Sequence, residues 1–207
     1  MTILWIVLAV TILFAAISLA WRLASRIWSL PCPSVTAWRF DNPLIRALTR
    51  TTLDRLGLRP GQKILEIGPG PGRLLIPAAA RVLPGGEAVG IDIQTGMIER
   101  LKARAEKTGM TNVTAILGDA AQPHVPEASF DVAFLCTALG EIPDRAAALA
   151  QCHRALKAGG VLSITEMFGD PHYQFRATVQ RLAEAAGFRL QSVTGGWWMF
   201  TANFVKP

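Results

Sequence analysis

Short apolar runs alternate with helical stretches from Gln62 onward, and this alternation constrains the fold more than any other feature of the sequence. The pattern is typical of a parallel sheet flanked by helices. It predicts strands at 63–68, 87–92, 114–119, 131–136 and 160–166, and helices near 73–83, 95–108, 144–157 and 173–186. Two further strand-like runs, 188–194 and 197–205, are separated only by Gly195 and Gly196 and predict an antiparallel hairpin. We expect a Rossmann-like α/β fold with a mostly parallel, seven-stranded sheet that ends in this hairpin.

The length of 207 residues leaves room for one such domain and a short appendage. We expect three parts. Residues 1–30 form a transmembrane helix with a juxtamembrane extension, residues 31–60 form a basic linker and an amphipathic cap helix, and residues 61–207 form the α/β domain.

The segment Ile3–Ala20 contains no charge, no Pro and no Gly. Its 18 residues nearly span a hydrocarbon core of about 30 Å, so we interpret it as a membrane-spanning helix. A cleaved signal peptide is the alternative, but only Met1 and Thr2 precede the apolar run and no basic region is present. Arg22 and Arg26 follow the run, and the positive-inside rule then places the rest of the chain in the cytoplasm. The expected localisation is a single-pass membrane protein with a cytoplasmic domain.

The net charge of +6 is confined to one part of the chain. Residues 1–63 hold eight basic and two acidic side chains, which account for the whole excess. A basic juxtamembrane segment is attracted to anionic headgroups, whereas a nucleic-acid binder would carry the excess on the domain that contacts the polymer. We therefore expect membrane lipids as partners and no nucleic acid; solvated helix faces are the alternative explanation.

A glycine-rich turn follows the first predicted strand of the domain, in the sequence Glu66-Ile-Gly-Pro-Gly-Pro-Gly-Arg73. Gly68 and Gly70, on either side of Pro69, would let the backbone approach a ligand closely. Such a turn is weak evidence by itself. A dinucleotide site prefers G-x-G-x-x-G, and Arg73 occupies the position of the third glycine.

Three carboxylates narrow the choice of ligand. Asp92 ends the second strand, where it could accept both ribose hydroxyls, although this would equally suit NAD. Asp119 ends the third strand, where it could accept the adenine amino group. Glu66 would lie beneath a ligand that bears ammonium and sulfonium charges, which suits S-adenosylmethionine and would repel a pyrophosphate.

With these motifs in order, residues 60–207 resemble the class I S-adenosylmethionine-dependent methyltransferases. ILEIGPGPGRL is similar to their first motif, GIDI to their acidic ribose loop, GDAAQPHVPEASFDVAFL to their adenine loop and fourth strand, and LKAGGVLSITE to the turn into their fifth strand. The resemblance implies S-adenosyl-L-methionine as methyl donor. It places Glu66, Gly68, Pro69 and Gly70 around the methionine portion, Asp92 and Ile93 at the ribose, Asp119 and Ala120 at the adenine, and Thr137 facing the donor.

No metal is expected. The three cysteines, Cys32, Cys136 and Cys152, lack the spacing of a metal site, and we expect no disulfide between them in a reducing cytoplasm.

The acceptor site should lie outside the carboxyl ends of the strands, in the loops 136–144 and 166–173. Glu141, Asp170, His172 and Tyr173 are the groups there that could take or orient a proton, and they are our candidate catalytic residues. Asp170-Pro171 also has the pattern of a helix cap followed by the first helical residue.

The acceptor itself is less constrained by the sequence. Thr137-Ala-Leu-Gly140 stands where amino methyltransferases of DNA bases or protein glutamine carry Asn or Asp before Pro-Pro-Tyr or Pro-Pro-Trp. With the predicted anchor, the chain is similar to quinone-ring and phospholipid methyltransferases, which implies a hydrophobic or amphipathic acceptor. The alternatives are a soluble small-molecule acceptor, a non-catalytic membrane scaffold that binds S-adenosylmethionine, and an NAD-dependent or nucleotide-sugar Rossmann protein.

Overall fold

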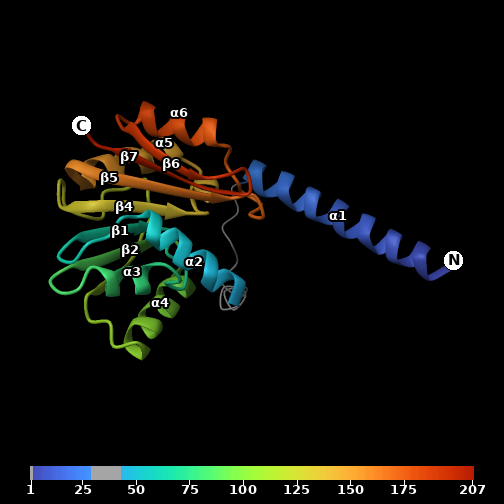
Figure 1. Ribbon diagram of the computed structural model, residues 1–207, viewed down its shortest axis with the longest axis horizontal. Coiled ribbons are helices and arrows are strands. Elements are labelled where there is room, and N and C mark those ends of the chain that lie inside the picture. Colours follow the sequence, from blue (N-terminus) through green and yellow to red (C-terminus); the bar gives the residue numbers. More distant parts are fainter. Residues whose placement is uncertain (1, 29–42) are drawn as a thin grey trace.

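A computed structural model describes residues 2–28 and 43–207 (Figure 1). Its centre is a seven-stranded sheet in the order β3-β2-β1-β4-β5-β7-β6. The strands are β1 (Lys63–Ile67), β2 (Glu87–Asp92), β3 (Val113–Leu117), β4 (Phe130–Cys136), β5 (Leu156–Met167), β6 (Arg189–Gly195) and β7 (Met199–Val205). β1 to β5 are parallel, whereas β7 runs antiparallel to both β5 and β6. The predicted sheet and its closing hairpin are confirmed.

Helices cover both faces of the sheet. α2 (Pro43–Arg55), α3 (Leu75–Arg81) and α4 (Thr95–Lys107) lie on one face, and α5 (Arg145–Ala155) and α6 (Arg176–Ala185) lie on the other (Figure 1). β1 contributes side chains to the core on both faces of the sheet, because successive side chains of a strand point to opposite faces. Ile64 packs in the core beneath α3 and α4, and Leu65 packs in the core beneath α5 and α6.

The N-terminal helix α1 spans Thr2–Trp28 and leads away from the domain, and it touches the short helix η2 (Leu139–Glu141) (Figure 1). Among residues 2–28 and 43–207, no helix has both the length and the apolar character that crossing a bilayer requires. The predicted transmembrane helix and the single-pass localisation derived from it are therefore wrong. Residues 29–42, which hold Cys32 and the first part of the predicted linker, lie outside the described part of the chain.

Two boundaries near the domain's turns differ from the prediction. α3 begins at Leu75 and not at Arg73, because Gly68, Gly70 and Gly72 all adopt positive φ and extend the turn after β1. Trp197 and Trp198 lie in the turn of the hairpin and not in its second strand. The N–H of Gly196 donates to the carbonyl of Met199 at 3.0 Å and closes the turn. β7 therefore begins only at Met199.

Candidate active site

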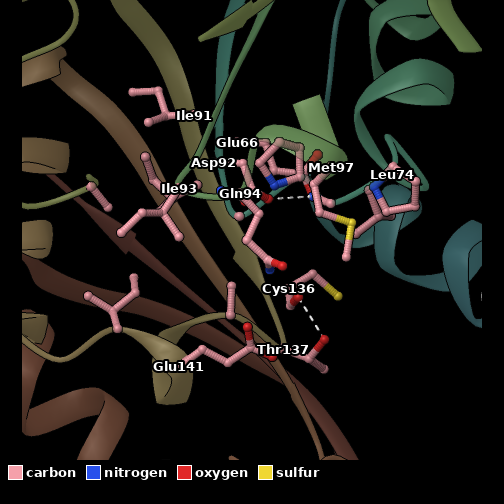
Figure 2. A pocket seen from close by; sticks show the side chains of 18 of the residues that line it. Glu66, Leu74, Ile91, Asp92, Ile93, Gln94, Met97, Cys136, Thr137 and Glu141 are labelled. Atoms are coloured by element: carbon pink, nitrogen blue, oxygen red, sulfur yellow. Dashed lines mark hydrogen bonds between the residues drawn. The ribbon is translucent and has the colours of Figure 1, made fainter. Parts of the chain in front are cut away.

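A pocket opens where the parallel strands end, at the edge of the sheet at which the order reverses between β1 and β4 (Figure 2). Ligands of open α/β sheets bind at such a switch point. Figure 2 shows Glu66 and Asp92 on one side of the pocket and Glu141 on the other. All nine residues predicted for the donor site line this one pocket: Glu66, Gly68, Pro69, Gly70, Asp92, Ile93, Asp119, Ala120 and Thr137.

Gly68 lets the backbone turn sharply at the end of β1. Its φ of 69° lies in the left-handed region, which costs little for glycine and more for other residues. A β-carbon here would lie 2.8 Å from the β-carbon of Ala138, so the space beside the turn also requires glycine. The N–H of Gly68 donates to the carbonyl of Ile91 at 2.9 Å and thereby ties the turn to β2.

Asp92 joins the glycine turn to the loop after β2. Its Oδ2 accepts the N–H of Gly70 at 3.1 Å, and its Oδ1 accepts the N–H of Gln94 at 2.9 Å. Burial raises the pKa of Asp92, and these backbone N–H groups oppose the increase. The carboxylate is thus held at the pocket wall by backbone donors from two loops.

Glu66 is the penultimate residue of β1, and its side chain is buried, with 2% of the residue exposed. Its Oε2 has no hydrogen-bond partner among the described residues. Burial raises the pKa of Glu66 to about 8, while the nearby Arg73 guanidinium acts in the opposite direction. A buried carboxyl with an unsatisfied oxygen is suited to a cationic ligand group, because an opposite charge would favour its ionised form.

The loop after β3 brings Asp119 and Ala120 to the same pocket. Asp119 accepts the N–H of Ala121 at 2.9 Å through its Oδ1, which fixes the loop. The N–H of Gly118 donates to the carbonyl of Asp92 at 3.0 Å, so this loop is tied to the end of β2. Ile93, the residue after Asp92, is 61% exposed and lines the same pocket.

Thr137 follows β4 with a φ of 52°, which is uncommon for a residue with a branched β-carbon. Two hydrogen bonds hold it there. Its N–H donates to the carbonyl of Thr165 at 2.9 Å, and its hydroxyl donates to the carbonyl of Cys136 at 2.8 Å. Backbone strain of this kind concentrates at functional sites, and here it directs the chain from β4 around the pocket into η2.

The four candidate catalytic residues separate into two groups. Glu141, on η2, and Asp170, after β5, line the pocket. His172 is 4% exposed and lies behind them, with its Nδ1 3.7 Å from Glu141 Oε1 and 3.7 Å from Asp170 Oδ1. Tyr173 is 5% exposed, and its hydroxyl donates to the carbonyl of Trp197 at 3.3 Å. The structure therefore brings two of the four to the pocket, and His172 and Tyr173 do not line it.

The alternative interpretation of Asp170 as a helix cap is wrong. Asp170 Oδ1 accepts the N–H of His172 at 2.7 Å within a turn, and α6 begins only at Arg176. Tyr173 is held before the helix by ring contacts with Phe168, Phe175 and Phe200, at centroid distances of 5.6, 5.4 and 6.2 Å.

Several pocket residues were not predicted from the sequence. Arg73, Leu74, Gln94 and Met97 line the pocket without having been predicted. Cys136, Ile142 and Pro143 line it from the loop 136–144, which was predicted as a whole but in which these three were not singled out. Met97, on α4, is 2% exposed, and its position in the helical pattern is the one expected of a core residue. Only Arg73 carried a signal, since it replaces a glycine in the turn. Within the described residues no group of three His, Cys, Asp or Glu side chains could hold a metal ion.

Residues 64–160 match the sequence model of a family described as a methyltransferase domain. A nocamycin O-methyltransferase from Saccharothrix syringae is 40% identical over 120 residues, which is 58% of this chain and 43% of the relative. A ubiquinone/menaquinone biosynthesis C-methyltransferase from Shewanella sp. (strain W3-18-1) is 33% identical over 135 residues, which is 64% of this chain and 53% of the relative. The chain thus spans about half the length of the curated relatives it matches.

Among solved structures, a SAM-dependent methyltransferase from Aquifex aeolicus superposes with a TM-score of 0.79 at 21% identity. The match covers 86% of this chain and 100% of that structure. This likeness concerns the fold. The chain has a Rossmann-like methyltransferase fold with a seven-stranded mixed sheet, and its residues 64–160 match a methyltransferase domain.

Proposed function

We propose that this chain is a methyltransferase that uses S-adenosylmethionine to methylate a hydrophobic or amphipathic small molecule. One observation carries the proposal. A single pocket combines Glu66, Asp92 and Asp119, from three successive strand ends, with two carboxylates on its opposite wall. Of the acceptors expected from the sequence, the proposal keeps the hydrophobic or amphipathic small molecule and leaves out the membrane lipid.

The pocket fits the donor by its charges. The unsatisfied, buried Oε2 of Glu66 suits the donor's cationic end. Asp92 lies at the end of β2, where its oxygens could accept ribose hydroxyls while it keeps the N–H groups of Gly70 and Gln94. Asp119 and Ala120, at the end of β3, border the place left for the adenine.

When bound, S-adenosylmethionine supplies a methyl group whose bond to the sulfonium sulfur breaks with its electron pair going to sulfur, as the acceptor atom bonds to the methyl carbon. The chain's main contribution is to hold the two reactants in line. The turn at Gly68 and the strained Thr137 form fixed backbone on either side of the pocket. Such rigid positioning requires no reorganisation during the reaction.

Glu141 and Asp170 are suited to take the proton that a hydroxyl acceptor loses. Their side chains are 21% and 19% exposed, and both approach His172 Nδ1 at 3.7 Å. The two carboxylates therefore lie together beside His172. Because that wall is acidic, the acceptor should be neutral or cationic, such as a phenol, an enol or a quinol, since an anionic acceptor would be repelled. The matched O- and C-methyltransferases support an acceptor of this kind.

The first test combines donor binding with methyl transfer. S-adenosylhomocysteine is titrated calorimetrically, and labelled methyl transfer is followed into a panel of phenols, enols and quinols and into a matched panel of carboxylic and phosphate acceptors. We expect binding, and labelling confined to the first panel. Asp92→Asn should weaken binding by about tenfold or more, because the ribose would lose an ionised acceptor.

Asp131→Asn is the matched control for this experiment. Asp131 also accepts a backbone N–H, that of Lys63 at 2.8 Å, but it does not line the pocket. No binding by the wild-type chain would overturn the proposal. Binding without transfer to either panel would favour the non-catalytic binding protein.

A further inference from the structure

Exposed aromatic side chains gather where the β6–β7 hairpin meets the loop after β5. The ring of Phe168 lies 5.7 Å from Trp197 and 6.2 Å from Trp198, measured between centroids. The buried ring of Tyr173 lies 5.6 Å from Phe168 and 5.4 Å from Phe175. We call the exposed members the aromatic patch: Phe168, Phe175, Trp197 and Trp198, which are between 38% and 73% exposed. A contiguous apolar surface on a folded protein commonly marks a binding site.

The aromatic patch is held rigidly. The N–H of Phe168 donates to the carbonyl of Trp198 at 2.7 Å, and the hydroxyl of Tyr173 donates to the carbonyl of Trp197 at 3.3 Å. β5 and β7 are paired up to the residue next to Phe168. A partner that covers the patch would therefore bury apolar surface at little cost in ordering.

The aromatic patch adjoins the pocket. Phe168 and Asp170 share one loop, and Asp170 lines the pocket. Because β7 runs antiparallel to β5, the turn of the hairpin lies at the carboxyl end of β5, which is the edge at which the pocket opens. A surface that binds the patch would lie beside this opening.

A second exposed apolar element begins at the same edge. α1 touches η2, whose Glu141 lines the pocket, and leads away from the domain (Figure 1). Residues 4–8 of α1 are all apolar and are between 47% and 72% exposed. A folded partner would need one surface that matches a hairpin turn and another that matches a single helix. A fluid lipid surface adapts to both shapes and therefore suits them better.

Two arginines flank the aromatic patch. Arg176 follows Phe175 and is exposed. Arg55 lies against the hairpin, because a β-carbon on Gly195 would lie 3.1 Å from its Nη1. Neither guanidinium forms an ion pair with a carboxylate among residues 2–28 and 43–207. The acidic residue of this region, Asp170, lines the pocket. Indole rings and unpaired cations together favour the headgroup region of a bilayer with anionic lipids.

We propose that the aromatic patch docks on the surface of a bilayer that contains anionic lipids. Trp197 and Trp198 enter the headgroup region, and Arg55 and Arg176 contact lipid phosphates. This is a surface contact and involves no membrane-crossing helix. Docking itself is independent of the proposed function. Its consequence rests on that function: a hydrophobic or amphipathic acceptor is concentrated in the bilayer, and docking brings the pocket to it.

The test measures sedimentation of the full chain with vesicles of phosphatidylcholine, with and without added phosphatidylglycerol. Trp197→Ser combined with Trp198→Ser should lower the partition coefficient by about tenfold or more on both kinds of vesicle, because two indoles lose their apolar contact. Arg55→Gln combined with Arg176→Gln should lower it by about fivefold per arginine, and only where phosphatidylglycerol is present. Added salt should reduce the effect of the arginines and leave that of the tryptophans.

Matched controls exchange exposed residues of the same kinds elsewhere. Leu83→Ser combined with Leu117→Ser removes two exposed apolar side chains outside the patch. Arg100→Gln combined with Lys102→Gln removes two exposed cations of α4. Both variants should bind vesicles as the wild type does, and thermal unfolding shows whether each variant is folded.

A second measurement detects lipid contact at the patch directly. Replacing the other four of the six tryptophans by Phe leaves Trp197 and Trp198 as the only indoles. Lipids with brominated acyl chains should then quench their emission when vesicles bind. This separates contact at the patch from any binding through α1.

Three results would overturn the docking. Unchanged vesicle binding after loss of both tryptophans, or emission that lipid does not quench, would mean that lipid does not cover the patch. A dimer that dissociates only in this double variant would identify a second copy of the chain as the occupant. Titration of S-adenosylhomocysteine tests the proposed function separately, because neither Trp197 nor Trp198 lines the pocket.

Discussion

A β-carbon on Gly140 would lie 1.9 Å from the carbonyl oxygen of His172. η2, which ends at Glu141, is therefore packed directly against the loop that carries Asp170 and His172. Arg145 strengthens this arrangement from α5, by donating to the carbonyls of Leu139 and Gly140 at 3.1 and 3.0 Å. Gly140, which has no reactive side chain, therefore allows the close packing that sets the distance between the carboxylates of Glu141 and Asp170.

Gly140→Ala should separate donor binding from methyl transfer. The added methyl group must push η2 away from the loop, and a displacement of this size in positioned groups lowers the rate by about tenfold or more. The dissociation constant of S-adenosylhomocysteine should change by less than about threefold, because Glu66, Asp92 and Asp119 follow other strands. Gly196→Ala, where no atom lies within 4 Å of the new β-carbon, is the control. Equal losses in rate and in donor affinity would contradict this separation.

Gly68→Ala should destabilise the fold through two effects that a second substitution can separate. The left-handed backbone costs an alanine about 1 kcal/mol, and the contact with Ala138 adds about 1 kcal/mol or more. Ala138→Gly in the same chain removes only the contact, so it should recover part of the loss. Urea unfolding of the wild type, both single variants and the double variant gives the interaction energy. Strictly additive effects would show that the two residues do not meet.

Donor binding should depend on pH through Glu66. The pKa of this carboxyl is about 8 in the free protein, so below pH 8 an ammonium ligand must displace a proton from it. Affinity for S-adenosylhomocysteine should therefore increase as pH rises from 6 towards 8, by up to about tenfold per pH unit, and level off above. Calorimetry in buffers of different ionisation heat counts the released proton. Glu66→Gln should abolish the slope and the exposed Glu87→Gln should preserve it; a flat wild-type profile would refute the role of Glu66.

Glu166 should make the protein less stable as pH rises. Burial raises the pKa of Glu166 from 4.5 to about 8, while the N–H of Gln174, which donates to its Oε2 at 3.2 Å, opposes the increase. The folded state then binds a proton that the unfolded state releases between these values. The free energy of unfolding should fall across pH 4.5 to 8, by at most about 1.4 kcal/mol per unit from this group.

Glu166→Gln isolates that contribution. It should be more stable than the wild type at pH 8 and should show a shallower decline, the remainder coming from Glu66, whose pKa is raised in the same way. Urea unfolding at pH 5, 6.5 and 8 provides the measurement, with the exposed Glu184→Gln as control. Parallel profiles for the wild type and Glu166→Gln would mean that Glu166 is already ionised in the folded protein.

Local sequence predicted the strands well, and the nine residues that it selected for donor binding all line one pocket. The run 87–92 was predicted as a strand and is β2, because apolar residues bounded by glycine and an aspartate leave few alternatives. Asp92 could be selected because its distance from the glycine turn follows from the length of one helix and one strand. Where a residue's position depends on a single strand end, spacing along the chain is sufficient.

The acceptor side depends on contacts that spacing does not contain. His172 and Tyr173 are close in sequence to Asp170, yet a turn held by the Asp170 side chain directs them behind the pocket. Trp197 has the composition of a strand residue but lies in a turn, where it is 73% exposed. The membrane span was predicted from the apolar composition of the N-terminal run alone, whereas no helix of the described residues is both long and apolar enough to cross a bilayer.

The carboxylates that line the pocket fall into two sets, one on each side of the boundary between β1 and β4. Glu66, Asp92 and Asp119 belong to β1, β2 and the loop after β3, whereas Glu141 and Asp170 belong to the segments after β4 and β5. Changes in the second set can accumulate without disturbing the first. Under the proposed function, evolution could therefore change the acceptor by remodelling two short loops while Glu66, Asp92 and Asp119 stay the same.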